Sequence, residues 1–287
     1  MGGTAPSRSG DRRRGSVRPR HAGRAYPRRT SMRRGTRGLI LAAGRGSRLG
    51  RLTSRRPKAL VPLAGKPLIA HQLDSFREAG VHPVAVVSGY LGGQLRDLGV
   101  DLFENPEWSR TQMVRSLACA APWLREGPTV ISYGDVICAP SVLRRLAECE
   151  EEIAVACDLE WRRLWEARFD DPLADAETFR FAPDGSVAEI GHRPRRIAEI
   201  EAQYMGLFRL TPEGWRRIEQ RLARWGRRET DGLDVTTLLD RLIEDDVRVA
   251  AVPVRGGWIE VDRPGDLELY ERWIREGKSF LSACTRR

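Results

Sequence analysis

Two glycines and two cations follow the first apolar run of the sequence. The run Leu39–Ala43 leads into Gly44-Arg45-Gly46, and Arg48 and Lys58 come shortly afterwards. Glycine takes backbone conformations that are closed to other residues, so main-chain N–H groups can approach phosphate oxygens. At an effective dielectric near 20, one cation about 4 Å from a phosphate oxygen contributes roughly 4 kcal/mol of gross Coulomb attraction, before desolvation. The segment therefore predicts a loop that holds a triphosphate.

Other phosphate-binding motifs fit this segment less well. A P-loop needs G-x-x-x-x-G-K-[ST], but Leu49 stands where its second glycine belongs. A dinucleotide fingerprint needs its third glycine at the same place. The remaining alternative is a strand-to-helix turn whose glycines serve only the chain reversal. The presence of Arg48 and Lys58 argues against that alternative.

Two aspartates stand at the ends of apolar runs and could hold a divalent cation. Asp135 closes the run that starts at Val130, and Asp262 closes the run that starts at Trp258. Ligands of α/β sheets bind at the carboxyl ends of strands, and Mg²⁺ is usually held by one or two carboxylates together with phosphate oxygens and water. The alternative for each aspartate is a helix cap or a turn. That alternative competes most strongly at Asp262, because Arg263-Pro264 follows it.

Short apolar runs alternate with segments of helical period from Arg37 onward, which predicts βα units. We expect an α/β fold, a Rossmann-like three-layer α/β/α sandwich with a mainly parallel mixed sheet. The expected strands lie near residues 38–42, 83–88, 129–133, 153–157 and 204–210. The expected helices open at Pro67 with a stop at Gly80, run from Met113 towards Leu124, follow a cap at Asp234, and start at Pro264 to end around Glu276.

The segment from residue 159 to residue 202 breaks this alternation. It contains Trp161 and Trp165, many charged residues and two proline-containing turns. Insertions on α/β sheets usually shape a substrate site, because binding occurs at the carboxyl ends of the strands. We therefore expect the insertion to form the site of a second substrate, the acceptor.

The positive charge of the chain is concentrated at its N-terminus. Residues 1–37 contain twelve Arg, no Lys and one acidic residue, a net charge of +11, which leaves −1 on the remaining 250 residues. An arm over residues 1–36 has too little apolar content to fold, and we expect it to be disordered. It could contact nucleic acid or a membrane surface, or act as a transit-like segment. Equally, Met32 could be the true start of the protein.

The double motif L-A-A-G-x-G-[ST]-R-[LM] and P-K-[AP]-L, at residues 41–49 and 57–60, resembles the nucleoside triphosphate-dependent nucleotidyltransferase superfamily with its glycosyltransferase-A-like fold. The resemblance implies a nucleotidyltransferase domain over residues 37–280 and Mg²⁺ held by Asp135 and Asp262. An acceptor oxygen that is already anionic would attack the α-phosphorus in line, without a general base. The implied catalytic residues are Lys58, at the α-phosphate or the incoming oxygen, and Arg48, at the departing phosphates.

Further segments resemble one branch of this superfamily, the cytidylyltransferases for phosphocholine and small phosphonates. They are residues 111–117, 132–135, 161–178, 189–191 and 203–207. The resemblance implies CTP as a substrate and implies these nucleotide-binding residues: Leu41, Ala42, Ala43, Gly44, Gly46, Ser88, Gln112 and Ser116. Relatives usually have Asn where Gln112 stands, which leaves the fine specificity open. The implied acceptor-binding residues are Trp161, Arg168, Glu177 and Tyr204.

The acceptor is constrained by two opposing features of the insertion. Trp161 and Trp165 lie one helical turn apart and could wall a choline cage, or they could pack in the core. The basic residues favour a doubly anionic phosphonate, or they form a solvated face. These residues are Arg162, Arg163, Arg168, His192, Arg193, Arg195 and Arg196.

The predicted function is transfer of CMP from CTP to a small phosphonate of the phosphonoformate or 2-aminoethylphosphonate type, with release of pyrophosphate. The alternatives are a phosphocholine or sugar 1-phosphate acceptor and, outside enzymes, a nucleic-acid-associated scaffold that uses the Arg-rich arm.

Other classes lack their sequence features. The five cysteines show no C-x-x-C spacing and the four histidines no H-x-x-x-H pair, so neither a disulfide framework nor a zinc site is expected. No apolar run reaches the length of a membrane span, and we expect a cytoplasmic protein without a membrane partner.

Overall fold

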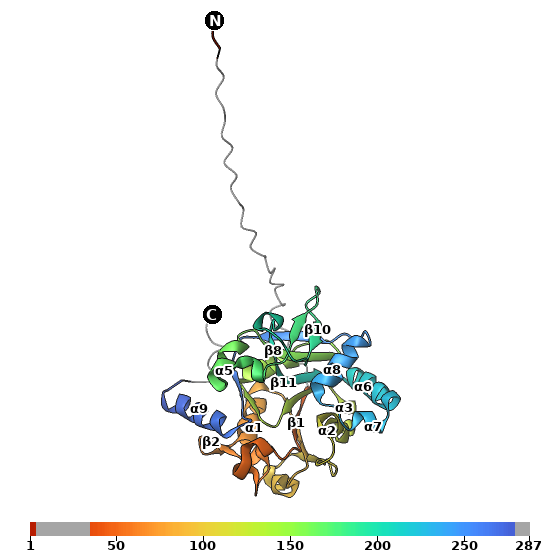
Figure 1. Cartoon of the computed structure of the whole chain (residues 1–287). Helices are drawn as coiled ribbons and strands as arrows, with labels where there is room; N and C mark the ends of the chain where they lie inside the picture. Colours follow the sequence, from red (N-terminus) through yellow and green to blue (C-terminus); the bar gives the residue numbers. More distant parts are fainter. Residues whose placement is uncertain (4–34, 279–287) are drawn as a thin grey trace. The chain divides into compact units, whose positions relative to one another are not determined.

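Seven strands form the central sheet, in the order β12-β8-β11-β6-β1-β4-β5. A computed structural model of the chain describes residues 1–3 and 35–278 (Figure 1). The sheet strands are β1 (Arg37–Ala42), β4 (Val84–Ser88), β5 (Asp101–Glu104), β6 (Thr129–Tyr133), β8 (Ile153–Asp158), β11 (Gln203–Leu210) and β12 (Ala250–Val254). Neighbouring strands are parallel except around β11, which is antiparallel to both β6 and β8. This mixed, mainly parallel sheet confirms the predicted α/β fold, and each expected strand is present.

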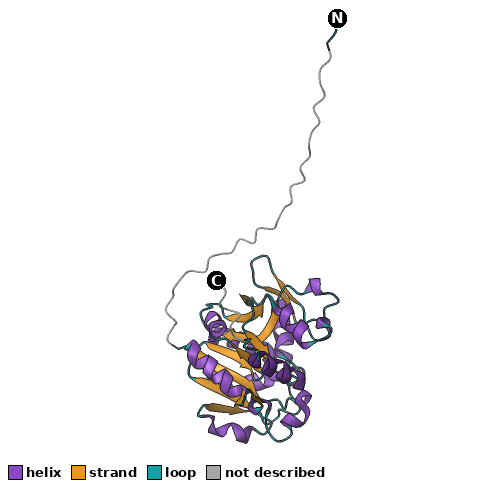
Figure 2. Cartoon of the chain, turned by 90° about the vertical axis from the view of Figure 1, so that its left-hand side faces the viewer, coloured by secondary structure: helices purple, strands orange, loops and turns teal. Residues whose placement is uncertain are grey.

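The sheet is buried on both faces, as parallel sheets require. Successive residues of β1 show the alternation: Ile40 belongs to one apolar cluster, whereas Leu39 and Leu41 belong to the other. The first cluster is closed by α1, α4, α5 and α9 and the second by α2, α3, α6 and α8. Figure 1 shows α1, α5 and α9 on one side of the strands and α2, α3, α6 and α8 on the other. In Figure 2, seen from the α9 side, helices cross in front of the strands.

Helices α1, α8 and α9 begin where the sequence predicts, whereas α4, α5, α6 and α7 were not among the expected helices. The helix bounds are α1 (Leu68–Ala79), α2 (Met113–Cys119), α3 (Ala121–Glu126), α4 (Pro140–Ala147), α5 (Trp161–Arg168), α6 (Pro212–Trp225), α7 (Arg227–Thr230), α8 (Val235–Glu244) and α9 (Pro264–Arg275). Gly80 ends α1 in the left-handed conformation, and the Asp234 side chain caps α8 by accepting from the Thr237 amide. The single helix expected from Met113 to Leu124 is two helices, because the backbone at Ala120 leaves the helical region.

The segment between β8 and β11 adds no strand to the central sheet. It contains α5, the 3₁₀ turns η4 (Pro172–Ala174) and η5 (Ile197–Glu199), and an antiparallel hairpin of β9 (Phe179–Phe181) and β10 (Val187–Ile190). Its two ends are neighbours, since Asp158 and Gln203 are paired across β8 and β11.

Besides the β9–β10 hairpin, two further short ribbons of the described residues lie outside the central sheet. One pairs β2 (Pro62–Leu63) with β3 (Lys66–Pro67), and the other pairs β7 (Val136–Cys138) with β13 (Trp258–Glu260). Three further 3₁₀ segments are η1 (Ser47–Thr53), η2 (Lys58–Leu60) and η3 (Gly92–Leu98).

No helix in residues 1–3 and 35–278 combines the length and apolar character of a membrane span. Most of the predicted arm, residues 4–34, lies outside the described residues, as do residues 279–287. The domain boundaries at 36 and 280 therefore stay predictions.

Candidate active site

The loop after β1 is shaped by Gly46 rather than by both predicted glycines. Gly46 has a φ of 69°, in the left-handed region, and a Cβ there would lie 2.8 Å from Cβ and Cδ of Lys58. A side chain at this position would displace the lysine. Gly44 has no left-handed φ, and a Cβ there would meet open space. Its bare backbone thus leaves room beside the loop, at the carboxyl end of β1, where a phosphate group could approach.

Two carboxylates from distant parts of the sequence are brought together by the β7–β13 ribbon. Glu260 is paired with Val136, the residue after Asp135, and the amide of Val261 donates to the carbonyl of Asp135 at 3.0 Å. Carboxylate oxygens of Asp135, Glu260 and Asp262 lie within 4.8 Å of one another. The two predicted metal ligands therefore meet, and a third carboxylate, which the sequence analysis missed, joins them.

The turn that carries Asp135 is held from α1 by a buried amide. Nε2 of Gln72, a residue only 2% exposed, donates to the carbonyls of Tyr133 and Val136 at 2.6 Å each. Gly134 passes so close to β1 that a Cβ would lie 2.8 Å from the carbonyl oxygen of Leu41. These contacts fix the position of the Asp135 carboxylate relative to the phosphate loop.

The Lys58 ammonium group lies between the two aspartates. It donates to Oδ2 of Asp135 and to Oδ1 of Asp262, at 2.5 Å in each case. Burial opposes the charged form of Lys58, but the two carboxylates outweigh it and raise its pKa. Arg48 reaches the other oxygen of Asp262 at 3.0 Å. The two predicted catalytic cations thus converge on Asp262.

The carboxylates differ in how easily they ionise. Burial also opposes the ionised form of Asp262, yet the charge and hydrogen bond of Lys58, aided by Arg48, lower its pKa. Burial and the neighbouring Asp262 and Asp135 raise the pKa of Glu260 well above its usual range, despite the lowering effect of Arg168. Three carboxylates at one point need compensating positive charge.

A divalent cation fits this cluster. Hard cations such as Mg²⁺ prefer carboxylate oxygens, and three side chains here offer one atom each at one point. Oδ1 of Asp135 is buried and has no hydrogen-bond partner among the described residues, so it is free to accept a ligand bond. Asp135, Glu260 and Asp262 would hold the ion.

The other predicted nucleotide-binding residues differ in how far their polar groups are already engaged within the protein. Ser88, at the end of β4, is buried and donates weakly to the carbonyl of Phe103. The Ser116 hydroxyl accepts from Asn105 at 3.0 Å. Gln112 precedes α2 with an exposed side chain, so its amide is available to a ligand. Leu41, Ala42 and Ala43 form the buried end of β1 and its exit.

Two tryptophans of the segment 159–202 pack in the interior. Trp161 and Trp165 are 4% and 3% exposed, with ring centroids 6.0 Å apart, and Trp165 also contacts Trp258. This favours the packing interpretation of the tryptophan pair over a choline cage. The observed contacts of Arg168 are likewise with protein groups, Glu260 and Asp266. Acceptor contacts from Trp161 and Arg168 stay predictions.

Glu177 lies in an acidic, partly buried region beside two tyrosines. Among the described residues its carboxylate has no ion-pair or hydrogen-bond partner. Burial, then Asp234 and Asp175, raise the pKa of Glu177 to about 7. The rings of Tyr133 and Tyr204 meet edge to face, with their centroids 5.9 Å apart. Burial, together with the nearby charge of Glu177, raises the pKa of both hydroxyls.

The arginines of the insertion are divided between two environments. Arg168 is buried, whereas a hollow of about 420 Å³ is lined by Thr178, Arg180, Glu189, His192, Arg193, Arg195, Arg196 and Glu199. Within the described part, Arg196 is paired with Glu199, while Arg180, Arg193 and Arg195 have no ion pair.

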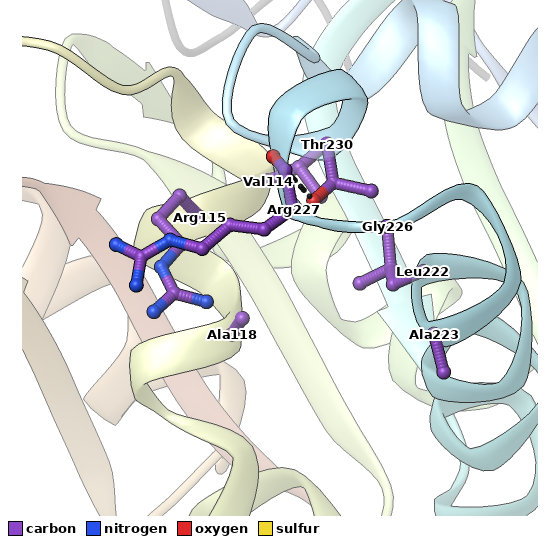
Figure 3. Close-up of a pocket in the computed structure, with 8 residues that line it drawn as sticks. All are labelled: Val114, Arg115, Ala118, Leu222, Ala223, Gly226, Arg227 and Thr230. Atoms are coloured by element: carbon purple, nitrogen blue, oxygen red, sulfur yellow. Dashed lines mark hydrogen bonds between the residues drawn. The ribbon is translucent and has the colours of Figure 1, made fainter.

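A second hollow, of about 240 Å³, lies between α2 and the α6–α7 junction (Figure 3). Val114, Arg115 and Ala118 line it from α2, and Figure 3 shows the guanidinium groups of Arg115 and Arg227 on one side of it. Both arginines pair with Glu107. The hollow contains none of the clustered carboxylates.

The phosphate loop, Lys58 and the cluster of Asp135, Glu260 and Asp262 together form a site suited to chemistry on a triphosphate. On this fold, such a site defines the class of the nucleotidyltransferases. The chain belongs to the MobA-like NTP transferase family, whose domain matches residues 38–192. It is an enzyme of the nucleotidyltransferase class, as the motif resemblance implied.

Several known proteins are similar to this chain, and they match different fractions of its length. CTP:phosphoglutamine cytidylyltransferase of Campylobacter jejuni is 32% identical over 247 residues, which are 80% of this chain and 97% of that protein. CMP-5'-(3-aminopropyl)phosphonate synthase of Streptomyces rubellomurinus is 40% identical over 136 residues, 45% of this chain and 22% of that protein. The solved CTP:phosphocholine cytidylyltransferase of Streptococcus pneumoniae has a TM-score of 0.62 at 20% identity, over 83% of this chain and 99% of that one, which supports the fold.

Proposed function

We propose that the enzyme transfers CMP from CTP to a small acceptor that carries a phosphonate or phosphate group and an amine, and releases pyrophosphate. The choice of CTP rests on the relatives, which include cytidylyltransferases for phosphoglutamine and for an aminopropylphosphonate. The transfer itself rests on one observation: Lys58, Asp135 and Asp262 meet at the edge of the sheet where the phosphate loop leaves β1.

In the proposed reaction an anionic oxygen of the acceptor forms a bond to the α-phosphorus of CTP. The bond from that phosphorus to the bridging oxygen breaks, and pyrophosphate leaves with the electron pair. No proton is transferred, so the site needs positioning and positive charge rather than a base. A bound Mg²⁺ would neutralise phosphate charge and orient the triphosphate. Lys58, released from the carboxylates, would contact the α-phosphate, and Arg48 and the loop amides would bind the departing phosphates.

An amine on the acceptor is favoured by Glu177. An unpaired carboxylate in a region with Asp175 and Asp234 has a raised pKa, and an ammonium group beside it would supply the missing positive charge. This supports a 2-aminoethylphosphonate-type acceptor over phosphonoformate, which has no amine. The buried tryptophans give less support to a phosphocholine acceptor.

A phosphorylated amino acid is a second candidate acceptor. The relative that matches over nearly its full length acts on phosphoglutamine, according to its name. An amino acid also carries a carboxylate, and the unpaired Arg180, Arg193 and Arg195 beside His192 could attract one.

Pyrophosphate release tests the proposal directly. The full chain with Mg²⁺ is assayed with CTP, UTP, dTTP, ATP and GTP against 2-aminoethylphosphonate, phosphonoformate, phosphoglutamine, phosphocholine and glucose 1-phosphate. Turnover with CTP and an amine-bearing acceptor is the expected result. Turnover only with a sugar phosphate, or with another nucleotide, would overturn the proposed specificity.

A further inference from the structure

Arg168 is a charged residue whose side chain is fully buried at the end of α5. Its Nη1 donates to Oε2 of Glu260 at 2.8 Å, and its Nε and Nη2 donate to the two oxygens of Asp266 at 3.0 and 3.2 Å. A guanidinium group offers this planar, two-pronged geometry and a lysine does not. One arginine thus engages two carboxylates at the start of α9 and the end of β13.

Asp266 connects Arg168 to the backbone that carries Asp262. The Asp266 side chain is 4% exposed, and its Oδ2 accepts from the amides of Asp262 at 2.7 Å and Arg263 at 2.9 Å. Arg168 therefore acts on the carboxylate cluster by two routes. It contacts the Glu260 carboxylate directly, and through Asp266 it fixes the peptide that orients Asp262.

Arg168 also supplies positive charge to the carboxylate cluster, in addition to its packing contacts. Lys58 must leave the carboxylates if they are to hold a cation, whereas Arg168 can stay, because it does not contact Asp135 or Asp262. Arg168 is then a permanent counter-charge beside Glu260. It also belongs to the insertion, and Arg263 adds a second connection, to Asp175 at 3.5 Å and over the Phe169 ring at 4.6 Å.

We propose that Arg168 is a positioning residue for the metal site, and that through it the insertion of residues 159–202 sets the geometry of Glu260 and Asp262. The inference rests on the proposed function for the role of the metal in transfer. It assigns Arg168 a task different from the acceptor contact that the sequence resemblance implied. The ligand concerned is a divalent cation held by Asp135, Glu260 and Asp262.

The test compares Arg168→Lys with Arg163→Lys in the full chain. Arg168→Lys keeps the charge but loses the two-pronged contact, so it is more tolerable than removal of the charge. Arg163 lies on the same helix with a side chain 80% exposed, and is the matched control. Mn²⁺ affinity is measured by electron paramagnetic resonance titration, with and without CTP, alongside thermal unfolding and the kcat and KM values.

Arg168→Lys is expected to weaken Mn²⁺ binding about tenfold or more and to lower kcat more than it raises the KM for CTP. Arg163→Lys should match the wild type. Unchanged Mn²⁺ affinity in a destabilised Arg168→Lys protein would overturn the proposal, because Arg168 would then be structural only. Absence of Mn²⁺ binding by the wild type would overturn it as well. If the wild type binds Mn²⁺ but transfers no nucleotide, the proposed function fails while the Mn²⁺ comparison still tests Arg168.

Discussion

Gly46 lies directly against the side chain of Lys58, so the position of the lysine depends on the absence of a side chain at Gly46. A Cβ on Gly46 would come within 2.8 Å of Cβ and Cδ of the lysine. Because Lys58 also lies between Asp135 and Asp262, the conformation of one glycine is linked to the state of the carboxylate cluster.

Gly46→Ala is expected to destabilise the fold and to lower kcat. The left-handed φ alone costs a non-glycine residue about 1–2 kcal/mol, and the displaced lysine adds to that cost. Thermal unfolding of Gly46→Ala and Gly44→Ala checks the stability difference, since Gly44 has open space and no left-handed φ. Equal stability of the two variants would contradict this account of the loop.

Asp135→Asn should lower turnover by orders of magnitude and leave the fold intact. It removes a carboxylate from the cluster but almost no volume. Steady-state pyrophosphate release with Mg²⁺, together with the unfolding temperature, measures both effects. The exposed Asp97→Asn controls for loss of one negative charge. Near-normal Mg²⁺-dependent turnover of Asp135→Asn would refute the metal assignment.

Lys58→Met should have opposite effects on metal binding and on catalysis. Without nucleotide, Mn²⁺ should bind the variant more tightly, because no ammonium group then occupies the space between the carboxylates. The kcat should fall at least a hundredfold if Lys58 stabilises charge that develops in the transition state. Lys66→Met, which removes a half-exposed surface ion pair, is the control. An effect confined to KM would place Lys58 in ground-state binding.

Glu177→Gln should stabilise the protein at pH 8 and weaken acceptor binding. The pKa of Glu177 is about 7 instead of 4.5, so between these values the folded state binds more protons than the unfolded state, and the unfolding free energy falls as the pH rises. The shift corresponds to about 3 kcal/mol at most, or roughly 1–2 kcal/mol after solvent screening. Gln mimics the protonated form, so no gain is expected at pH 5.

Unfolding scans at pH 5 and pH 8, with the exposed Glu78→Gln as control, measure the stability effect. The KM for 2-aminoethylphosphonate should rise more than tenfold, and the KM for an acceptor without an amine should change less. A stability gain that is equal at both pH values would mean that the charge of Glu177 does not cause it. An equal rise in KM for both acceptors would remove the argument for an amine.

Patterns of neighbouring residues in the sequence predict the strands of the sheet and three residues of the candidate site. The sequence indicates Asp135 and Asp262 because each lies two positions beyond an apolar strand, β6 or β13, and it indicates Lys58 through its motif at the start of η2. Glu260 was missed, although it ends β13 two residues before Asp262, and side chains two residues apart in an extended chain share a face. That spacing was the available signal.

Other features depend on contacts that no local pattern contains. The β7–β13 ribbon joins strands of three residues from distant parts of the chain, too short for a periodic signal. The basic insertion residues looked alike in sequence, yet Arg168 is buried against two carboxylates while Arg193 and Arg195 are exposed. Burial of a charge depends on which partners the fold supplies.

The pairing of Asp158 with Gln203 has a consequence for the exchange of the segment between them. Since the segment between them leaves and re-enters neighbouring strands, a segment from another enzyme could be grafted at these two points without a break in the sheet. Arg168 limits that freedom. A transplanted segment that lacks an arginine at this place would leave Glu260 and Asp266 without the buried cation that contacts both, so recombination at this junction must carry the arginine with it.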